Sequence, residues 1–216
     1  MSATTRYAAM SRRAAMTAAA LTAMVAMAGC NSGGAGAPAD GDMAMGAPEG
    51  AKVTVVEYAS VTCHVCEAWQ KENWEAFKAA YVDTNKVRYV FREIPTPPAE
   101  IAVAGFLVAR CAGEGKYFDV VHELLASREE FVTDPRSTLF RVGNGAGLSN
   151  DQVQQCITNE AAQIAAEERA QAARSAGVDS TPTFLVNGTK VITPGSPSGP
   201  SMDDLSKAID AELAKN

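Results

Sequence analysis

Apolar and polar residues of the segment 53–94 follow a pattern that predicts a strand, a helix and a second strand. Val53 to Tyr58 is a β-branched and aromatic run bounded by turn-forming residues, which is typical of a strand. Aromatic residues then recur at helical spacing with charged residues between them, which predicts an amphipathic helix over 65–81. The alternation from 86 to 94 predicts the second strand, which the following prolines end. This order is that of a β-α-β unit.

The pattern from residue 99 to about 176 is helical. The predicted helices are separated by Gly-rich or helix-starting residues and cover 101–111, 117–127, 136–142 and 151–176. They lie between the β-α-β unit and the last predicted strands. The region of about 98–176 is therefore interpreted as a helical insertion.

The C-terminal part predicts a hairpin and one more helix. Segments 184–186 and 190–192 are short strand patterns, and the Asn-Gly pair between them is typical of a tight turn. Pro182 cannot donate to a strand ladder, so it marks an edge strand or a turn. A helix over 202–214 has one apolar face, which should cover the sheet. The sequence thus predicts an α/β domain over 51–216.

The first 29 residues have the pattern of an export signal. Three arginines and no acidic residue precede an apolar run over 14–28, which is short for a membrane-spanning helix. The tetrapeptide Met27-Ala28-Gly29-Cys30 resembles the lipobox of bacterial lipoproteins, in which the cysteine carries the lipid. The alternative is an ordinary signal-peptidase site nearby, with Cys30 left as a free thiol. Either interpretation predicts a protein of the periplasm or cell envelope.

Residues 30–50 are interpreted as a flexible tether between this anchor and the domain. They are mainly Gly, Ala, Pro, Asp and Met, without periodicity. Met43 and Met45 within the tether are attributed to composition alone.

Charge argues against nucleic acid as a partner. The chain has 19 basic and 25 acidic residues, a net charge of −6, and loss of residues 1–29 would remove three basic and no acidic residues to give −9. Proteins bind nucleic acid largely through Lys and Arg contacts to phosphate, so no nucleic-acid partner is expected.

Cys63 and Cys66 are spaced to lie on the first turn of the predicted helix at 65–81. Unpaired backbone N–H groups and the positive end of the helix dipole stabilise a thiolate there, so Cys63 should be reactive and Cys66 suited to resolve a mixed disulfide. The alternatives are a structural disulfide, half of a metal site or two unrelated core cysteines. A zinc site needs further ligands, whereas the chain has two histidines and no second CxxC, so no metal or other cofactor is expected.

The five cysteines cannot all pair in an oxidising compartment. If Cys30 is acylated, the other four form two pairs, Cys63 with Cys66 and Cys111 with Cys156. Cys111 and Cys156 fall on predicted helices of the insertion, at roughly inward positions, where a disulfide or two buried free thiols are the alternatives.

Near the C-terminus the chain reads Gly-Val-x-x-Thr-Pro-Thr-Phe-x-Val-Asn-Gly over 177–188. A β-α-β unit with CxxC at its helix start, a helical insertion, this motif and a hairpin together resemble the DsbA-like branch of the thioredoxin fold. The resemblance covers the chain from about Ala51 to its end. It implies a thioredoxin fold with an inserted helical domain.

The resemblance assigns roles to single residues. It implies that Cys63 is an exposed nucleophile, Cys66 the resolving thiol and Thr181-Pro182 the cis-proline loop whose backbone binds an extended substrate peptide. Glu57 matches a buried acid that manages the proton of Cys66, although a solvent-facing strand residue is the alternative. Members of the family often have Pro-His between the two cysteines, with histidine directly before the second one. This chain has His64-Val65 there, so its histidine would favour the Cys63 thiolate from a different position.

The function implied is that of an exported, lipid-anchored thiol-disulfide oxidoreductase. It would pass the Cys63-Cys66 disulfide to reduced exported proteins and be recharged by a membrane oxidase of the DsbB type. One alternative is a disulfide reductase or isomerase kept reduced by a membrane electron donor. Another is a non-enzymatic module that binds copper or another soft metal through CxxC, with His64 as a further ligand.

Overall fold

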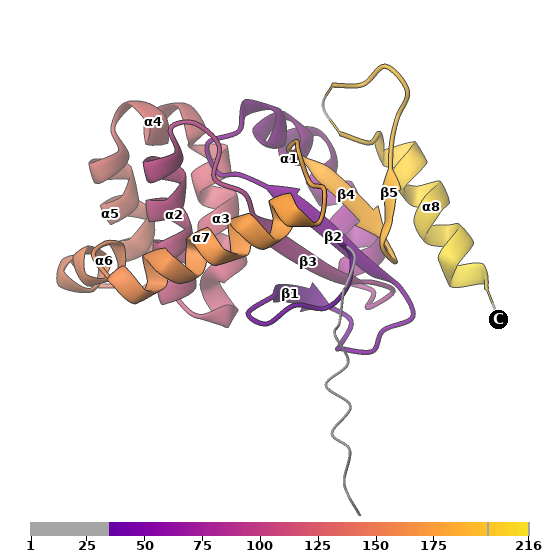
Figure 1. Ribbon diagram of the computed structural model, residues 1–216, viewed down its shortest axis with the longest axis horizontal. Coiled ribbons are helices and arrows are strands. Elements are labelled where there is room, and N and C mark those ends of the chain that lie inside the picture. The colour runs from indigo at the N-terminus through magenta and orange to yellow at the C-terminus, as the bar shows by residue number, and fades with distance from the viewer. Residues whose placement is uncertain (1–34, 198, 216) are drawn as a thin grey trace, which may run out of the picture. The chain divides into compact units, whose positions relative to one another are not determined.

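The computed structural model describes residues 35–197 and 199–215, which fold around a five-stranded sheet of order β1-β3-β2-β4-β5 (Figure 1). The parallel pair β2 and β3 lies at its centre, and the other neighbouring strands pair antiparallel. The strands are β1 Met43–Gly46, β2 Thr54–Ala59, β3 Arg88–Glu93, β4 Thr183–Val186 and β5 Thr189–Val191.

The predicted β-α-β unit is present. Helix α1, His64–Phe77, continues into one π-helical segment, η1 Lys78–Val82, and the chain then enters β3. The C-terminal helix α8, Met202–Ala214, has the predicted bounds. Buried residues of α1 and α8 share one core with one face of the sheet, because both helices present an apolar stripe to it: Trp69, Phe77, Leu205 and Ile209 with Val55, Phe184 and Val186.

The helical insertion lies between β3 and β4 and ends with a helix that returns to the sheet. Its helices are α2 Ala99–Cys111, α3 Glu114–Ala126, α4 Arg128–Thr133, α5 Pro135–Gly145, α6 Asn150–Ile157 and α7 Glu160–Ser175. In Figure 1, α7 runs from the other helices of the insertion across the sheet. Ala173 of α7 packs with Val56, Tyr58 and Leu185, which face away from α1 and α8.

The insertion differs from the prediction in two places. The single helix expected over 151–176 is divided into α6 and α7, because Asn159 accepts a hydrogen bond from the Ala162 N–H and so begins a new helix. Helix α4 was not predicted at all. It is only six residues long, too short to show a clear period.

Part of the predicted tether is a strand. Residues 43–46 form β1, which pairs antiparallel with β3, and Met43 is buried in the core. Asp42 forms an ion pair with Arg92, whose guanidinium also donates to the carbonyls of Ala35 and Ala37. This strand exists because its backbone pairs with β3. Its own short Gly/Ala/Met sequence has no periodicity and therefore does not indicate a strand. The tether interpretation is therefore wrong for 43–46, and the contacts with Arg92 also hold Ala35, Ala37 and Asp42 against the sheet. The tether residues 30–34, which include Cys30, and the signal region 1–29 lie outside the described residues.

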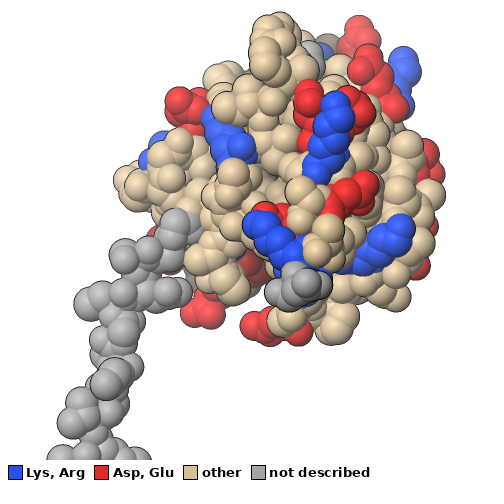
Figure 2. All heavy atoms as spheres, turned by 90° about the vertical axis from the view of Figure 1, so that its right-hand side faces the viewer, with Lys and Arg blue, Asp and Glu red and all other residues tan. Residues whose placement is uncertain are grey.

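Two surface properties of the described part bear on function. None of its helices is long and apolar enough to span a membrane, and the apolar run at 14–28 lies outside it. On the face shown in Figure 2, basic and acidic atoms lie beside one another instead of forming one continuous basic patch. Ion pairs such as that of Lys207 with Asp203 on α8 likewise bring opposite charges together on the surface.

Candidate active site

Cys63 and Cys66 lie together at the N-terminus of α1. Cys63 is the N-cap residue, with an extended backbone, and its sulfur accepts a hydrogen bond from the Cys66 N–H at 3.3 Å. The two thiols are free, so the structure describes the dithiol form. Cys63 retains 8% of its surface and Cys66 only 1%, so the reactive cysteine is less exposed than the resemblance implied.

The segment before β4 crosses the mouth of α1. Since β4 runs antiparallel to β2, with Thr183 opposite Tyr58, the residues preceding β4 reach the end of β2 where α1 begins. The Thr181-Pro182 peptide bond is cis. The Thr181 hydroxyl donates to the Cys63 sulfur at 3.3 Å, and its carbonyl oxygen lies 3.6 Å from the same sulfur. Pro182 therefore marks a turn, not an edge, because β4 lies between β2 and β5.

The surroundings of the two sulfurs shift their pKa values in opposite directions. The hydrogen bond from the Cys66 side chain lowers the pKa of Cys63 most, whereas burial raises it. Further hydrogen bonds from Thr181 and from the N–H groups of Cys66 and Val65 lower it as well, and the pKa is about 6. Burial, followed by the interactions with Cys63, raises the pKa of Cys66 well above its usual value. Near neutral pH Cys63 is therefore a thiolate, while Cys66 keeps its proton.

Glu57 is a buried carboxyl group on β2, with 4% of its surface exposed. The Tyr89 hydroxyl donates to its Oε2 at 2.5 Å. Burial raises the pKa of Glu57 to about 7, the hydrogen bond from Tyr89 opposes the rise, and the charge of Cys63 adds to it. The solvent-facing alternative for Glu57 is therefore wrong.

His64 lies on the first turn of α1 and is exposed. Among the described residues, no hydrogen bond joins it to Cys63; those on the Cys63 sulfur come from Thr181 and Cys66. His122, the other histidine of the chain, lies in α3 and packs edge-on against Trp74 at 4.2 Å between ring centroids.

Two residues near the site gave no signal in the sequence. Tyr89 follows the β-strand pattern of its neighbours, and only the register of β2 with β3 shows that it faces Glu57. Arg128 of α4 donates to Glu67 of α1 at 2.7 Å and to the carbonyl oxygen of Thr62 at 3.3 Å. Arg128 thus joins the helical insertion to the residue that precedes Cys63.

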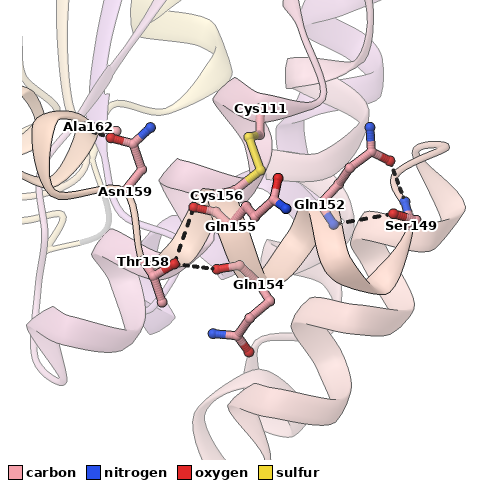
Figure 3. The surroundings of a disulfide bond; sticks show 9 residues. All are labelled: Cys111, Ser149, Gln152, Gln154, Gln155, Cys156, Thr158, Asn159 and Ala162. Carbon is pink, nitrogen blue, oxygen red and sulfur yellow. Dashed lines mark hydrogen bonds between the residues drawn. A yellow bond between two sulfur atoms is a disulfide. The ribbon is translucent and has the colours of Figure 1, made fainter.

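Cys111 and Cys156 form a disulfide between the ends of α2 and α6 (Figure 3). Cys156 is buried, whereas Cys111 is exposed, so the inward position expected for Cys111 is wrong. The same view shows the N-terminus of α6, where Ser149 and Gln152 each bond the other's backbone N–H. The helix that carries Cys156 is thus fixed at its start as well as by the disulfide.

Within residues 35–197 and 199–215, no three His, Cys, Asp or Glu side chains are grouped so that they could hold a metal ion.

Comparison with known proteins gives one family and a common fold. The family model described as Thioredoxin matches residues 39–211. Proteins named as candidate protein-disulfide oxidoreductases are 29% identical in Rickettsia conorii and 30% in Rickettsia prowazekii, each over 81% of this chain. The chain spans only 61% and 62% of the length of those two relatives.

Among solved structures, α-DsbA1 from Wolbachia pipientis has a similar fold. Its TM-score is 0.70 at 21% sequence identity, and the match covers 82% of this chain and 92% of that one. An identity this low indicates a shared fold and no more.

Proposed function

Because the chain belongs to the thioredoxin family and its fold is DsbA-like, we propose that it is a thiol-disulfide oxidoreductase of the cell envelope. In its oxidised form Cys63 and Cys66 form a disulfide, which the protein passes to reduced protein substrates. The observation that carries the proposal is the opposite shift of the two thiol pKa values, because an oxidant of this kind releases one stable thiolate and one protected thiol.

The reaction begins with the disulfide form. A substrate thiolate attacks the Cys63 sulfur, the bond to Cys66 breaks, and Cys66 leaves with the electron pair and takes up a proton. A second substrate thiolate then attacks the substrate sulfur of the mixed disulfide and expels Cys63 as a thiolate. The substrate leaves with a new disulfide, and the two electrons remain on the Cys63-Cys66 dithiol.

Helix α1 and Thr181 support the last step. The backbone N–H of Cys66 and the hydroxyl of Thr181 already point at the Cys63 sulfur, so the released thiolate needs no rearrangement to be stabilised. An extended substrate peptide would pair with the backbone of Thr181, whose carbonyl oxygen lies beside that sulfur. Glu57 would serve as the proton donor and acceptor for Cys66. His64 would add to the stabilisation of the thiolate from the first turn of α1.

The proposed location is supported by the sequence, and the proposed redox partner by the resemblance to DsbA-like proteins. The proposed anchor is a lipid on Cys30, supported by the lipobox-like Met27-Ala28-Gly29-Cys30, and the proposed electron acceptor is a membrane oxidase of the DsbB type. Cys111-Cys156 is proposed as a structural disulfide of the insertion, because it joins α2 to α6 far along the chain from CxxC.

The redox potential of Cys63 and Cys66, measured by equilibration with glutathione, tests the direction of electron flow. A value near about −120 mV supports an oxidant, and a value near about −270 mV contradicts it and favours the reductase alternative. The soft-metal alternative would be favoured by stoichiometric metal in protein purified without added metal.

A trapping experiment tests the proposed nucleophile. The variant Cys66→Ser cannot form the internal disulfide, so mixed disulfides with exported proteins should accumulate at Cys63. Cys63→Ser is the matched control and should give no adduct, since Cys66 is 1% exposed. Absence of any adduct in Cys66→Ser would count against an oxidoreductase.

A further inference from the structure

Tyr89 and Glu57 form a buried pair that interacts electrostatically with the two cysteines. In the parallel pairing of β2 and β3, Tyr89 lies opposite Val55, so its side chain shares a face of the sheet with Glu57, two residues further along. Tyr89 has 1% and Glu57 4% of its surface exposed, and 2.5 Å separates the phenol oxygen from Oε2 of the carboxyl group. The carboxyl group is thus away from bulk water and has a protein donor in its place.

The ring of Tyr89 is fixed by aromatic neighbours. Trp74 lies 5.1 Å from it between ring centroids, Phe77 5.6 Å and Phe118 5.8 Å, so rings from α1 and α3 surround it. A ring held in this way keeps its hydroxyl directed at Glu57. The hydrogen bond is therefore a fixed feature of the core.

The titratable groups that interact with Glu57 or with Tyr89 come from three elements. Cys63 and Cys66, at the start of α1, and Tyr89 of β3 interact with Glu57, while Tyr117 of α3 adds to the rise of the Tyr89 pKa. Burial raises the pKa of Tyr89 well above its usual value, and the neighbouring Glu57 raises it further. Tyr89 therefore remains a neutral donor at every pH at which the protein works.

We propose that Tyr89 is a positioning residue that holds the Glu57 carboxyl group as the proton donor and acceptor for Cys66. The inference rests on the proposed function. When a substrate thiolate breaks the Cys63-Cys66 bond, Glu57 gives its proton to the departing Cys66 sulfur and becomes a carboxylate. Tyr89 keeps its own proton and donates a hydrogen bond to the new negative charge. In the reverse step Glu57 takes the proton back from the Cys66 thiol.

A phenol suits this task better than a cation would. A lysine or arginine at the same distance would hold Glu57 ionised, and burial with no donor would hold it protonated. The neutral hydrogen bond from Tyr89 opposes burial only in part and leaves the pKa of Glu57 at about 7. Both forms of the carboxyl group are then populated near neutral pH, as a proton donor and acceptor requires.

The test is a titration of the Glu57 carboxyl group in the full reduced chain. Its protonated C=O band is followed by infrared spectroscopy against pH and assigned by its loss in Glu57→Gln. In Tyr89→Phe the midpoint should move upward by about one unit, because the bond to the carboxylate is lost. The pH profile of the reduction of the Cys63-Cys66 disulfide by dithiothreitol should move with it, and adding Tyr89→Phe to Glu57→Gln should change nothing further.

Tyr117→Phe is the matched control, because it removes a buried phenol that bonds a different carboxylate, Glu93, at 3.0 Å. It should leave the Glu57 midpoint in place. If Tyr89→Phe does not fold, a fluorinated tyrosine at position 89 keeps the packing and strengthens the donor, and the midpoint should then move downward. A midpoint that stays at the wild-type value, or that moves equally in Tyr117→Phe, would overturn the role of Tyr89. Wild-type protein that exchanges no disulfide would instead overturn the proposed function.

Discussion

The hydroxyl of Thr181 donates a hydrogen bond to the Cys63 sulfur at 3.3 Å, although the two residues are 118 positions apart in the chain. The contact exists because β4 pairs antiparallel with β2 and brings the cis-proline segment to the start of α1. A single hydroxyl from the C-terminal part of the domain thus acts directly on the reactive thiol.

Replacement of Thr181 by valine should raise the pKa of Cys63 from about 6. The Cys66 side chain lowers this pKa most and would remain, so a rise of about one unit is expected for the loss of one hydrogen bond to a thiolate. The ultraviolet absorbance of the thiolate, followed against pH, measures it. A less stable thiolate also makes the redox potential of the pair more negative.

The control for that substitution is Thr183→Val. The Thr183 hydroxyl donates to the Ser180 carbonyl oxygen and not to a sulfur, so the Cys63 titration should not change. An equal shift in both variants would mean that distortion of the loop, not the lost hydrogen bond, is responsible.

A chain that begins at Ala51 should be much less stable than one that begins at Ala35. The shorter chain lacks β1, which leaves the edge of β3 unpaired, and it leaves Arg92 without Asp42 although both side chains are largely buried. Loss of one partner of such a pair costs about 3 kcal/mol in the free energy of unfolding. Denaturant unfolding of the two chains measures the difference, and equal midpoints would show that residues 35–50 add nothing to the fold.

Replacement of both Cys111 and Cys156 by alanine should destabilise the protein. The disulfide joins residues 45 positions apart, and in the chain-entropy model a loop of this size contributes about 4 kcal/mol. The free energy of unfolding should fall by that order, while the thiolate titration of Cys63 should stay the same because none of its hydrogen bonds comes from the insertion cysteines. A changed Cys63 titration would contradict a purely structural role.

His122 should make the protein less stable in acid. Burial lowers the pKa of His122 from 6.5 to about 4 in the folded state, so between these values the unfolded chain binds more protons. Stability linked to His122 is then lost as the pH falls from about 6.5 to about 4. His122→Phe keeps a ring against Trp74 and should weaken this dependence in denaturant unfolding. An unchanged dependence would show that His122 does not titrate in this range.

The sequence by itself determined the parts of the protein that depend on neighbours along the chain. The β-branched and aromatic run before Cys63 and the helical spacing after it predicted β2 and α1, and Asn187-Gly188 predicted the hairpin. Both of these residues have positive φ, at 46° and 82°, as that turn requires. The CxxC at the helix start predicted the reactive pair, because the dipole and free N–H groups of a helix end are local properties.

Only the tertiary structure decided which distant residues meet those elements. The burial of Glu57, its contact with Tyr89 and the bond from Thr181 to Cys63 all depend on how β2 is paired with β3 and β4. A shift of one residue in that register would turn each side chain to the other face, and a strand that is buried on both faces, as β2 is, has no alternation that would specify the register. The same is true of β1, whose short sequence has no period and which exists because the open edge of β3 supplies its hydrogen-bond partners.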